Sequence, residues 1–222
     1  MAEKGQRTPV AEIYRTLRDR ICLLDVEPGA RLPEEALAAE FGVSRTPIRQ
    51  VLDRLEYDRL VVQRPGAGAT VAVVDAKEVR DVWAVRLKIA ELVGDFVRLP
   101  ASPAVLEELG DVRRGVDAVR VSRDLRELGA LYNRYHEAVL AVFSSDTLRR
   151  IHDQLYHQTA RVWLQFLPEM DLDAEIDVMA DEVDQTTQAM EGSSGPRLAE
   201  IRVEHMQMLL SRFNSHVARP LG

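Results

Sequence analysis

Residues 28–56, PGARLPEEALAAEFGVSRTPIRQVLDRLE, decide the fold of the first part of the chain. Pro33 and the two acidic residues after it suit the first turn of a short helix, and Gly42 ends that helix. Ser44 is a favourable N-cap for the next helix, which is expected to run to Leu55. Two short helices joined around a glycine predict a helix-turn-helix.

The second of these helices carries its positive charge on one side. Arg45 and Arg49 are one helical turn apart and lie away from the apolar face, with Thr46 beside them. Arginine can donate two hydrogen bonds to guanine O6 and N7, whereas Ser44 and Thr46 suit phosphate oxygens. Arginine pairs on helices are more often a solvated face, so the prediction of major-groove binding depends on the elements around this helix.

Further elements are predicted on both sides of the helix-turn-helix. Apolar residues recur every fourth position within residues 10–24, which indicates a first amphipathic helix. Residues 60–62 and 69–74 have strand composition, and a glycine-rich turn that begins with Arg64 separates them. The expected fold of residues 1–75 is therefore a winged helix-turn-helix of three helices and a two-stranded wing.

This arrangement resembles the winged-helix domain of the GntR family of bacterial regulators. The resemblance is carried by residues 28–56 and by LVVQRPGAGATVA at residues 60–72. It implies that Arg45 and Arg49 reach bases, with Ser44 and Arg64 as additional contacts. The complete set of DNA-contacting candidates is Arg31, Ser44, Arg45, Thr46, Arg49, Arg64, Gly66 and Gly68.

Long stretches of helical periodicity follow residue 75. They lie at 77–98, 103–119, 124–143, 146–167, 172–191 and 196–217. Prolines and serines interrupt the pattern between them. We expect residues 76–222 to form an antiparallel bundle of about six helices, so the fold class is mainly α with two domains.

Several polar residues fall on the predicted inward faces of this bundle. They are Arg86, Tyr132, His136, Arg161 and His205. Two inward arginines with a tyrosine and two histidines would suit an effector that bears a carboxylate, although the same arginines would equally suit ion pairs between helices. His152 and His157 are five residues apart, share no helix face and are assigned no site.

The helical part resembles the FadR-like subgroup, whose C-terminal FCD domain binds ligands, and LYNRYHEAVL at residues 131–140 resembles one of its motifs. Many members hold a divalent metal through an aspartate or asparagine and three histidines. The aligned positions here are Tyr132, His136, Val183 and His205, so half of that set is missing. We therefore expect no tightly held zinc or nickel at His136 and His205, and a pocket for an effector that persists without metal.

Composition limits the class of protein. The 222 residues are 46% hydrophobic, enough for two domains, and the single cysteine excludes an intramolecular disulfide. No apolar run approaches the roughly 20 residues of a membrane-spanning helix, so we expect a cytoplasmic protein with no membrane contact. The net charge of −7 argues mildly against nucleic-acid binding, but residues 1–75 are nearly balanced in charge.

The function expected from the sequence is a ligand-responsive DNA-binding transcriptional regulator, a repressor that binds double-stranded operator DNA as a homodimer. Two recognition helices about 34 Å apart would fit successive major grooves. Two alternatives stay open: a metal-dependent enzyme in the helical bundle and a protein-interaction module built on the winged helix. Because no nucleophile elbow, phosphate loop or dinucleotide motif occurs, no enzymatic activity is expected.

Overall fold

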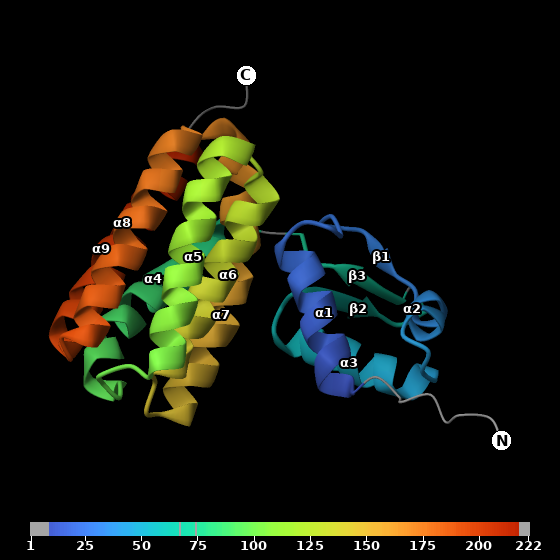
Figure 1. The fold of residues 1–222 in the computed structure, drawn as a ribbon. Helices are drawn as coiled ribbons and strands as arrows, with labels where there is room; N and C mark the ends of the chain where they lie inside the picture. Colours follow the sequence, from blue (N-terminus) through green and yellow to red (C-terminus); the bar gives the residue numbers. More distant parts are fainter. Residues whose placement is uncertain (1–8, 67, 74, 218–222) are drawn as a thin grey trace. The chain divides into compact units, whose positions relative to one another are not determined.

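The computed structural model describes residues 9–66, 68–73 and 75–217 (Figure 1). The chain divides into two compact units, residues 1–74 and 75–222. Each unit has its own secondary structure and its own buried core. In the part of the chain that is described, no helix is both long enough and apolar enough to cross a membrane.

The N-terminal unit combines three helices with a small antiparallel sheet. Its elements are α1 (Val10–Cys22), β1 (Arg31–Leu32), α2 (Glu34–Glu40), α3 (Arg45–Tyr57), β2 (Val61–Arg64) and β3 (Gly68–Val71). The predicted two-stranded wing is confirmed as β2 and β3, which pair antiparallel. A third strand was not predicted: β1 pairs with β3 and places Arg31 opposite Thr70. Two residues are too few to show an alternating pattern in the sequence.

The core of this unit lies between α1 and α3, which contact each other along their apolar faces. Ile13 and Leu17 from α1 and Ile48 and Leu52 from α3 are all completely buried. Because these side chains recur at intervals of four, each helix turns one stripe to the core and leaves its other faces to solvent. Gly42 joins α2 to α3 with a φ of 64°, a conformation that costs other residues energy.

The C-terminal unit consists mainly of six α-helices, which confirms the predicted bundle (Figure 1). They are α4 (Ala76–Leu92), α5 (Pro103–Ser122), α6 (Leu125–Ala141), α7 (Asp146–Phe166), α8 (Leu172–Glu191) and α9 (Gly195–Val217). Short 3₁₀ turns, Val93–Phe96 and Leu167–Glu169, extend α4 and α7. Among the described residues, all six of these helix starts are capped by a side-chain oxygen that accepts from the backbone, those of Asp75, Ser102, Asp124, Ser145, Asp171 and Ser194.

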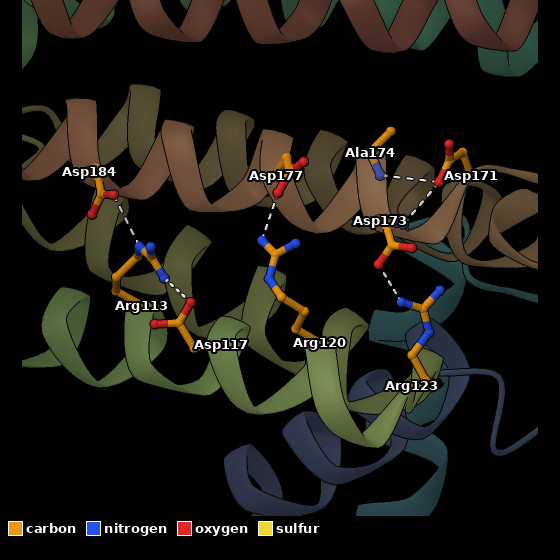
Figure 2. Close-up of polar contacts among 9 residues, drawn as sticks. All are labelled: Arg113, Asp117, Arg120, Arg123, Asp171, Asp173, Ala174, Asp177 and Asp184. Carbon is orange, nitrogen blue, oxygen red and sulfur yellow. Dashed lines mark hydrogen bonds and ion pairs between the residues drawn. The ribbon is translucent and has the colours of Figure 1, made fainter.

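An outer ladder of ion pairs joins α5 to α8 (Figure 2). From one end to the other it pairs Arg113 with Asp184, Arg120 with Asp177, and Arg123 with Asp173. Residue numbers rise along α5 while they fall along α8, as antiparallel helices require. All of these side chains except the half-buried Arg113 are exposed, and exposed ion pairs stabilise a fold by only about 0–1 kcal/mol each. The ladder therefore favours one register of the two helices without supplying much of the stability.

Candidate functional site

The N-terminal turns of α3 present the two predicted base-reading arginines to solvent. The side chains of Arg45 and Arg49 are 51% and 60% exposed. Ser44 occupies the N-cap position, as predicted, but its side chain makes no capping hydrogen bond. Its hydroxyl is thus left for another acceptor or donor, and a phosphate at a helix N-terminus is a favourable one.

Glu34, at the start of α2, holds both arginines together. Its Oε2 atom accepts hydrogen bonds from Arg45 Nε at 3.1 Å, from Arg45 Nη2 at 3.0 Å and from Arg49 Nε at 2.8 Å. Arg45 Nη1 also donates to Glu35 Oε1 at 3.1 Å. The hydrogen bonds from Arg49 and Arg45 lower the pKa of Glu34 below its ordinary value. One carboxylate oxygen therefore orients two guanidinium groups side by side on the exposed face of the helix.

The wing brings further candidates onto the same surface. A hollow of 270 Å³ is lined by residues that include Arg31 of β1, Arg45 of α3 and Gly68 of β3. At the end of the wing, Gly66 and Gly68 have φ values of 77° and 79°, so the tight turn depends on residues without a side chain. Ala67 between them lies outside the described residues.

Exposure is common to the whole predicted set. Each of the following is exposed to solvent: Arg31, Ser44, Arg45, Thr46, Arg49, Arg64, Gly66 and Gly68. The sequence did not indicate that Glu34 contacts the arginines, because acidic residues at a helix start are explained by the helix dipole alone. The signal that could have suggested it is the interval of eleven residues between Glu34 and Arg45, because these residues begin the two helices of the helix-turn-helix.

The second group of candidate residues lies inside the helical unit. Arg86, Tyr132, His136, Arg161 and His205 are all buried, with at most 9% of each residue exposed. They come from four helices: α4, α6, α7 and α9. Contacts gather four of them into two groups, and Arg161 is buried on α7.

Arg86 and His136 meet around one aromatic ring. The Arg86 guanidinium carbon lies 5.4 Å from the centre of the Tyr156 ring, and His136 stacks on the same ring at 3.7 Å. Arg86 also donates a hydrogen bond to the Thr159 hydroxyl. Burial lowers the pKa of Arg86 to about 9. Its guanidinium thus contacts a hydroxyl and an aromatic face, and although the charge of Glu182 attracts it, the two form no ion pair within the described residues.

Tyr132 and His205 form the second group, beside a buried carboxylate. Their ring centres are 6.1 Å apart, and His205 Nδ1 lies 2.8 Å from Glu182 Oε2. Arg202 of α9 pairs with the other oxygen of Glu182. Burial alone would raise the pKa of Glu182, but the charges of His205 and Arg202 outweigh it and lower the pKa. Ion pairing between helices therefore does occur here, at Arg202, which was not predicted.

An opening of 190 Å³ exposes part of this second group. Glu182 and His205 are among its lining residues, together with Asp181, Gln185 and Glu204. Pockets for drug-sized ligands are usually about 300–1,000 Å³. Only a small molecule would fit here without movement of the helices, and an acidic rim does not favour an anionic one.

The four residues aligned with the metal set of the FCD subgroup do not fit a metal ion. Val183 is apolar and buried in the core, with 1% of its surface exposed. The Tyr132 hydroxyl is buried and has no hydrogen-bond partner among the described residues, and the ring packs edge-on against Trp163 at 4.7 Å. His205 already faces Glu182 through Nδ1. Only His136 and His205 offer good ligand atoms, which is too few for a tight site.

His157, for which the sequence predicts no site, lies close to two other side chains that could bind a metal ion. His136 Nε2, Asp153 Oδ1 and His157 Nε2 all lie within 4.8 Å of one another. Asp153 is four residues before His157 and so shares its helix face, whereas His152 does not. His152 does not join this group, but it is buried, and its ring lies parallel to that of His136 at 5.3 Å.

Comparisons with known proteins are consistent with this geometry. Residues 9–71 match a family model described as "Bacterial regulatory proteins, gntR family". An uncharacterized HTH-type transcriptional regulator in an unstable DNA locus of Streptomyces ambofaciens is 40% identical over 144 residues, which cover 63% of this chain and 58% of that protein. The gluconate operon transcriptional repressor of Bacillus subtilis is 27% identical over 143 residues, which cover 63% of this chain and 57% of the repressor. The matched segment thus spans less than two thirds of these relatives.

Solved structures share the fold over nearly the whole chain. Escherichia coli McbR/YncC superimposes with a TM-score of 0.73 at 17% identity and covers 94% of this chain and 98% of its own. A regulator titled as a putative GntR protein from Rhodococcus sp. RHA1 gives a TM-score of 0.71 at 18% identity, with 93% of this chain and 97% of its own covered. Residues 9–71 thus match the GntR family of bacterial regulatory proteins, and the solved structures share the fold of nearly the whole chain.

Proposed function

We propose that this chain is a sequence-specific DNA-binding transcriptional regulator that responds to a small ligand. The observation that carries the proposal is the pair Arg45 and Arg49, exposed at the N-terminal end of the second helix of the helix-turn-helix. Arg31 and Gly68 line the same surface as Arg45. A recognition helix with a basic wing beside it is how winged helices place side chains in the major groove and on the phosphates.

On DNA, the two arginines would exchange Glu34 for base edges. Each guanidinium can donate two hydrogen bonds to guanine O6 and N7, which discriminates against a wrong base by about 1–3 kcal/mol. Ser44, Thr46, Arg31 and the wing would contact phosphates and set the register without reading sequence. A homodimer would place two such helices about 34 Å apart on a two-fold operator.

The proposed sign of regulation is repression. It is supported by the relative from Bacillus subtilis that is named a repressor of the gluconate operon. A dimer bound over a promoter blocks polymerase by occupying its site, and a ligand that favours another spacing of the recognition helices would release it.

The proposed effector is a small metabolite with a carboxylate, bound inside the helical unit near Arg86. The buried guanidinium contacts the Thr159 hydroxyl and the Tyr156 ring and has lost its hydration. A carboxylate would supply charge-assisted hydrogen bonds in place of that lost water, so binding of an anion would be favourable here. His136 stacks on the same ring and would form one wall of the site.

Selection from a library of randomised DNA duplexes tests DNA binding. The full chain should enrich a sequence with two-fold symmetry and half-sites about 10 base pairs apart. The Arg45→Ala, Arg49→Ala double variant should enrich none. If the wild-type chain enriches no sequence, the regulator is excluded in favour of a protein-interaction module or an enzyme.

Thermal unfolding with a panel of small mono- and dicarboxylates tests the effector. A ligand present at 100 times its Kd stabilises the native state by about 2.7 kcal/mol, so a binder should raise the Tm clearly. The shift should vanish in Arg86→Met, which keeps the volume and removes the charge. A shift that persists in Arg86→Met would place the ligand elsewhere.

A further inference from the structure

A cluster of two histidines and one aspartate lies between α6 and α7, and two of its three residues lie outside the set that the FCD resemblance aligns with a metal. His136 comes from α6, and Asp153 and His157 come from α7. We propose that these three residues bind a divalent transition metal such as zinc. The proposal does not rest on DNA binding, and of the aligned set it uses His136 alone.

The spacing of the ligand atoms fits one shared ion. His136 Nε2 lies 3.0 Å from Asp153 Oδ1, and His157 Nε2 lies 3.1 Å from the same oxygen. Zinc binds nitrogen and carboxylate oxygen at about 2.0–2.2 Å, which puts neighbouring ligand atoms on the order of 3 Å apart. The ion would therefore need only small movements of the side chains.

The helix geometry explains how α7 supplies two ligands. Asp153 and His157 are four residues apart, so they project from one face of the helix one above the other. Paired ligands at this interval are the usual means by which a single helix contributes two atoms to a metal. His136 then completes the set from the neighbouring helix.

The surroundings hold His136 in its orientation before any ion arrives. Its ring stacks on Tyr156 at 3.7 Å with an angle of 8° between the planes. The Tyr156 hydroxyl donates to Asn133 Oδ1 at 2.8 Å, which fixes the tyrosine in turn. Because the imidazole is already oriented, little conformational entropy remains to be lost on binding.

The burial of the three residues determines how an ion reaches them, and their donor atoms determine how many further ligands the ion can take. The side chains of His136 and His157 are 2% and 3% exposed, whereas that of Asp153 is 32% exposed and gives an ion a route from solvent. Two imidazoles and one carboxylate are a donor set that zinc accepts, with a fourth position left for water or an anion. Such a site suits a bound metal with an exchangeable ligand.

A metal-free explanation also exists for this geometry: Asp153 could simply accept hydrogen bonds from two neutral imidazoles. Binding of the metal by the purified full chain distinguishes the two. After treatment with a chelator and dialysis, the chain is titrated with Co²⁺ and visible absorption is recorded, because tetrahedral Co²⁺ gives intense bands. Zn²⁺ is then added to displace Co²⁺.

We expect one equivalent of Co²⁺ with intense visible bands that Zn²⁺ abolishes. Because loss even of residues that support ligands weakens metal binding by about 10- to 100-fold, loss of a ligand in Asp153→Asn or His157→Gln should weaken it at least about 100-fold. His205→Gln is the control and should bind as the wild type does. Circular dichroism of each variant shows that it is folded, and if Asp153→Asn is not folded, His157→Gln decides.

Two results would overturn the proposal. One is a folded wild-type chain that takes up no Co²⁺ or Zn²⁺, which would leave hydrogen bonding as the role of Asp153. The other is that His205→Gln loses metal binding while His157→Gln binds as the wild type does, which would place the ion at the aligned set. Neither result bears on the proposed DNA binding.

Discussion

Helix α3 and the interior of the helical unit both pair arginine with glutamate, in opposite surroundings. On α3, Arg49 is 60% exposed and shares Glu34 with Arg45. Between α8 and α9, Arg202 and Glu182 have side chains that are 5% and 4% exposed. The groups are chemically the same, but water competes for the first pair and is excluded from the second.

That difference in burial determines what each pair can do. An exposed ion pair gains little net free energy, so a phosphate or a base edge can replace the carboxylate at small cost. A buried pair has lost its hydration, and removal of one partner leaves a charge with neither water nor counterion. The exposed pair is thus suited to exchange partners on binding, whereas the buried pair is suited to fix the packing of two helices.

The largest effect is expected from breaking the buried pair. Glu182→Gln leaves Arg202 buried without its carboxylate and should lower the free energy of unfolding by about 3–5 kcal/mol. Urea denaturation followed by circular dichroism measures this. Glu34→Gln is the matched control because it removes the same group from the exposed pair. Equal urea midpoints for the two variants would contradict the assigned difference.

Acid should weaken the buried pair of Glu182 and Arg202. The pKa of Glu182 lies below its ordinary value of 4.5 in the folded chain, so the unfolded chain takes up a proton first as the pH falls. The stability contributed by Glu182 is therefore complete above pH 4.5 and is lost as the pH drops toward the folded pKa. Urea midpoints between pH 6 and pH 3 should fall less steeply for Glu182→Gln than for wild type. Parallel curves would show that Glu182 does not have a lowered pKa.

A smaller effect, of opposite sign, is expected on DNA. Glu34→Gln should raise the affinity for any duplex severalfold, because Arg45 and Arg49 no longer have to leave a carboxylate, and electrostatic attraction to phosphate is not specific to sequence. Fluorescence anisotropy at several salt concentrations measures it. The control is Glu40→Gln, which also removes one negative charge from α2. The native Glu40 pairs with Arg20 rather than with Arg45 or Arg49. If both variants gain equally, net charge alone explains the change.

The smallest effect should come from the outer ladder of Figure 2. Arg120 Nη2 lies 2.6 Å from Asp177 Oδ1, and both side chains are exposed. Arg120→Gln should therefore lower the free energy of unfolding by at most about 1 kcal/mol, and less at high salt. A loss as large as that of Glu182→Gln would mean that exposure does not set the strength of these pairs.

Most of the fold was predictable because its signals are local. Caps such as Asp75 and Ser102, and breaks at prolines and glycines, position the helices through contacts within a few residues. The strand Arg31–Leu32 was not predictable, since two residues become a strand only by pairing with β3. Pairing between residues far apart in the chain produces no periodic pattern of apolar residues in the sequence.

The candidate sites follow the same division. Arg45 and Arg49 could be predicted because one helix places both on its exposed side. The cluster of His136 with Asp153 and His157 was missed because it joins two helices, and only the interval from Asp153 to His157 is visible in the sequence. Residue type and spacing predict what one element presents, but not which buried groups of separate elements meet.

The central claim is that the exposed arginines of α3 read base sequence, and Arg49→Ala tests it most directly. Fluorescence anisotropy would compare this variant with wild type on the selected duplex and on a scrambled one. Arg20→Ala, which removes the same charge elsewhere, is the control. We expect Arg49→Ala to lose about 1–3 kcal/mol of binding free energy on the selected duplex and much less on the scrambled one. Equal losses on both duplexes, or none on either, would contradict the account.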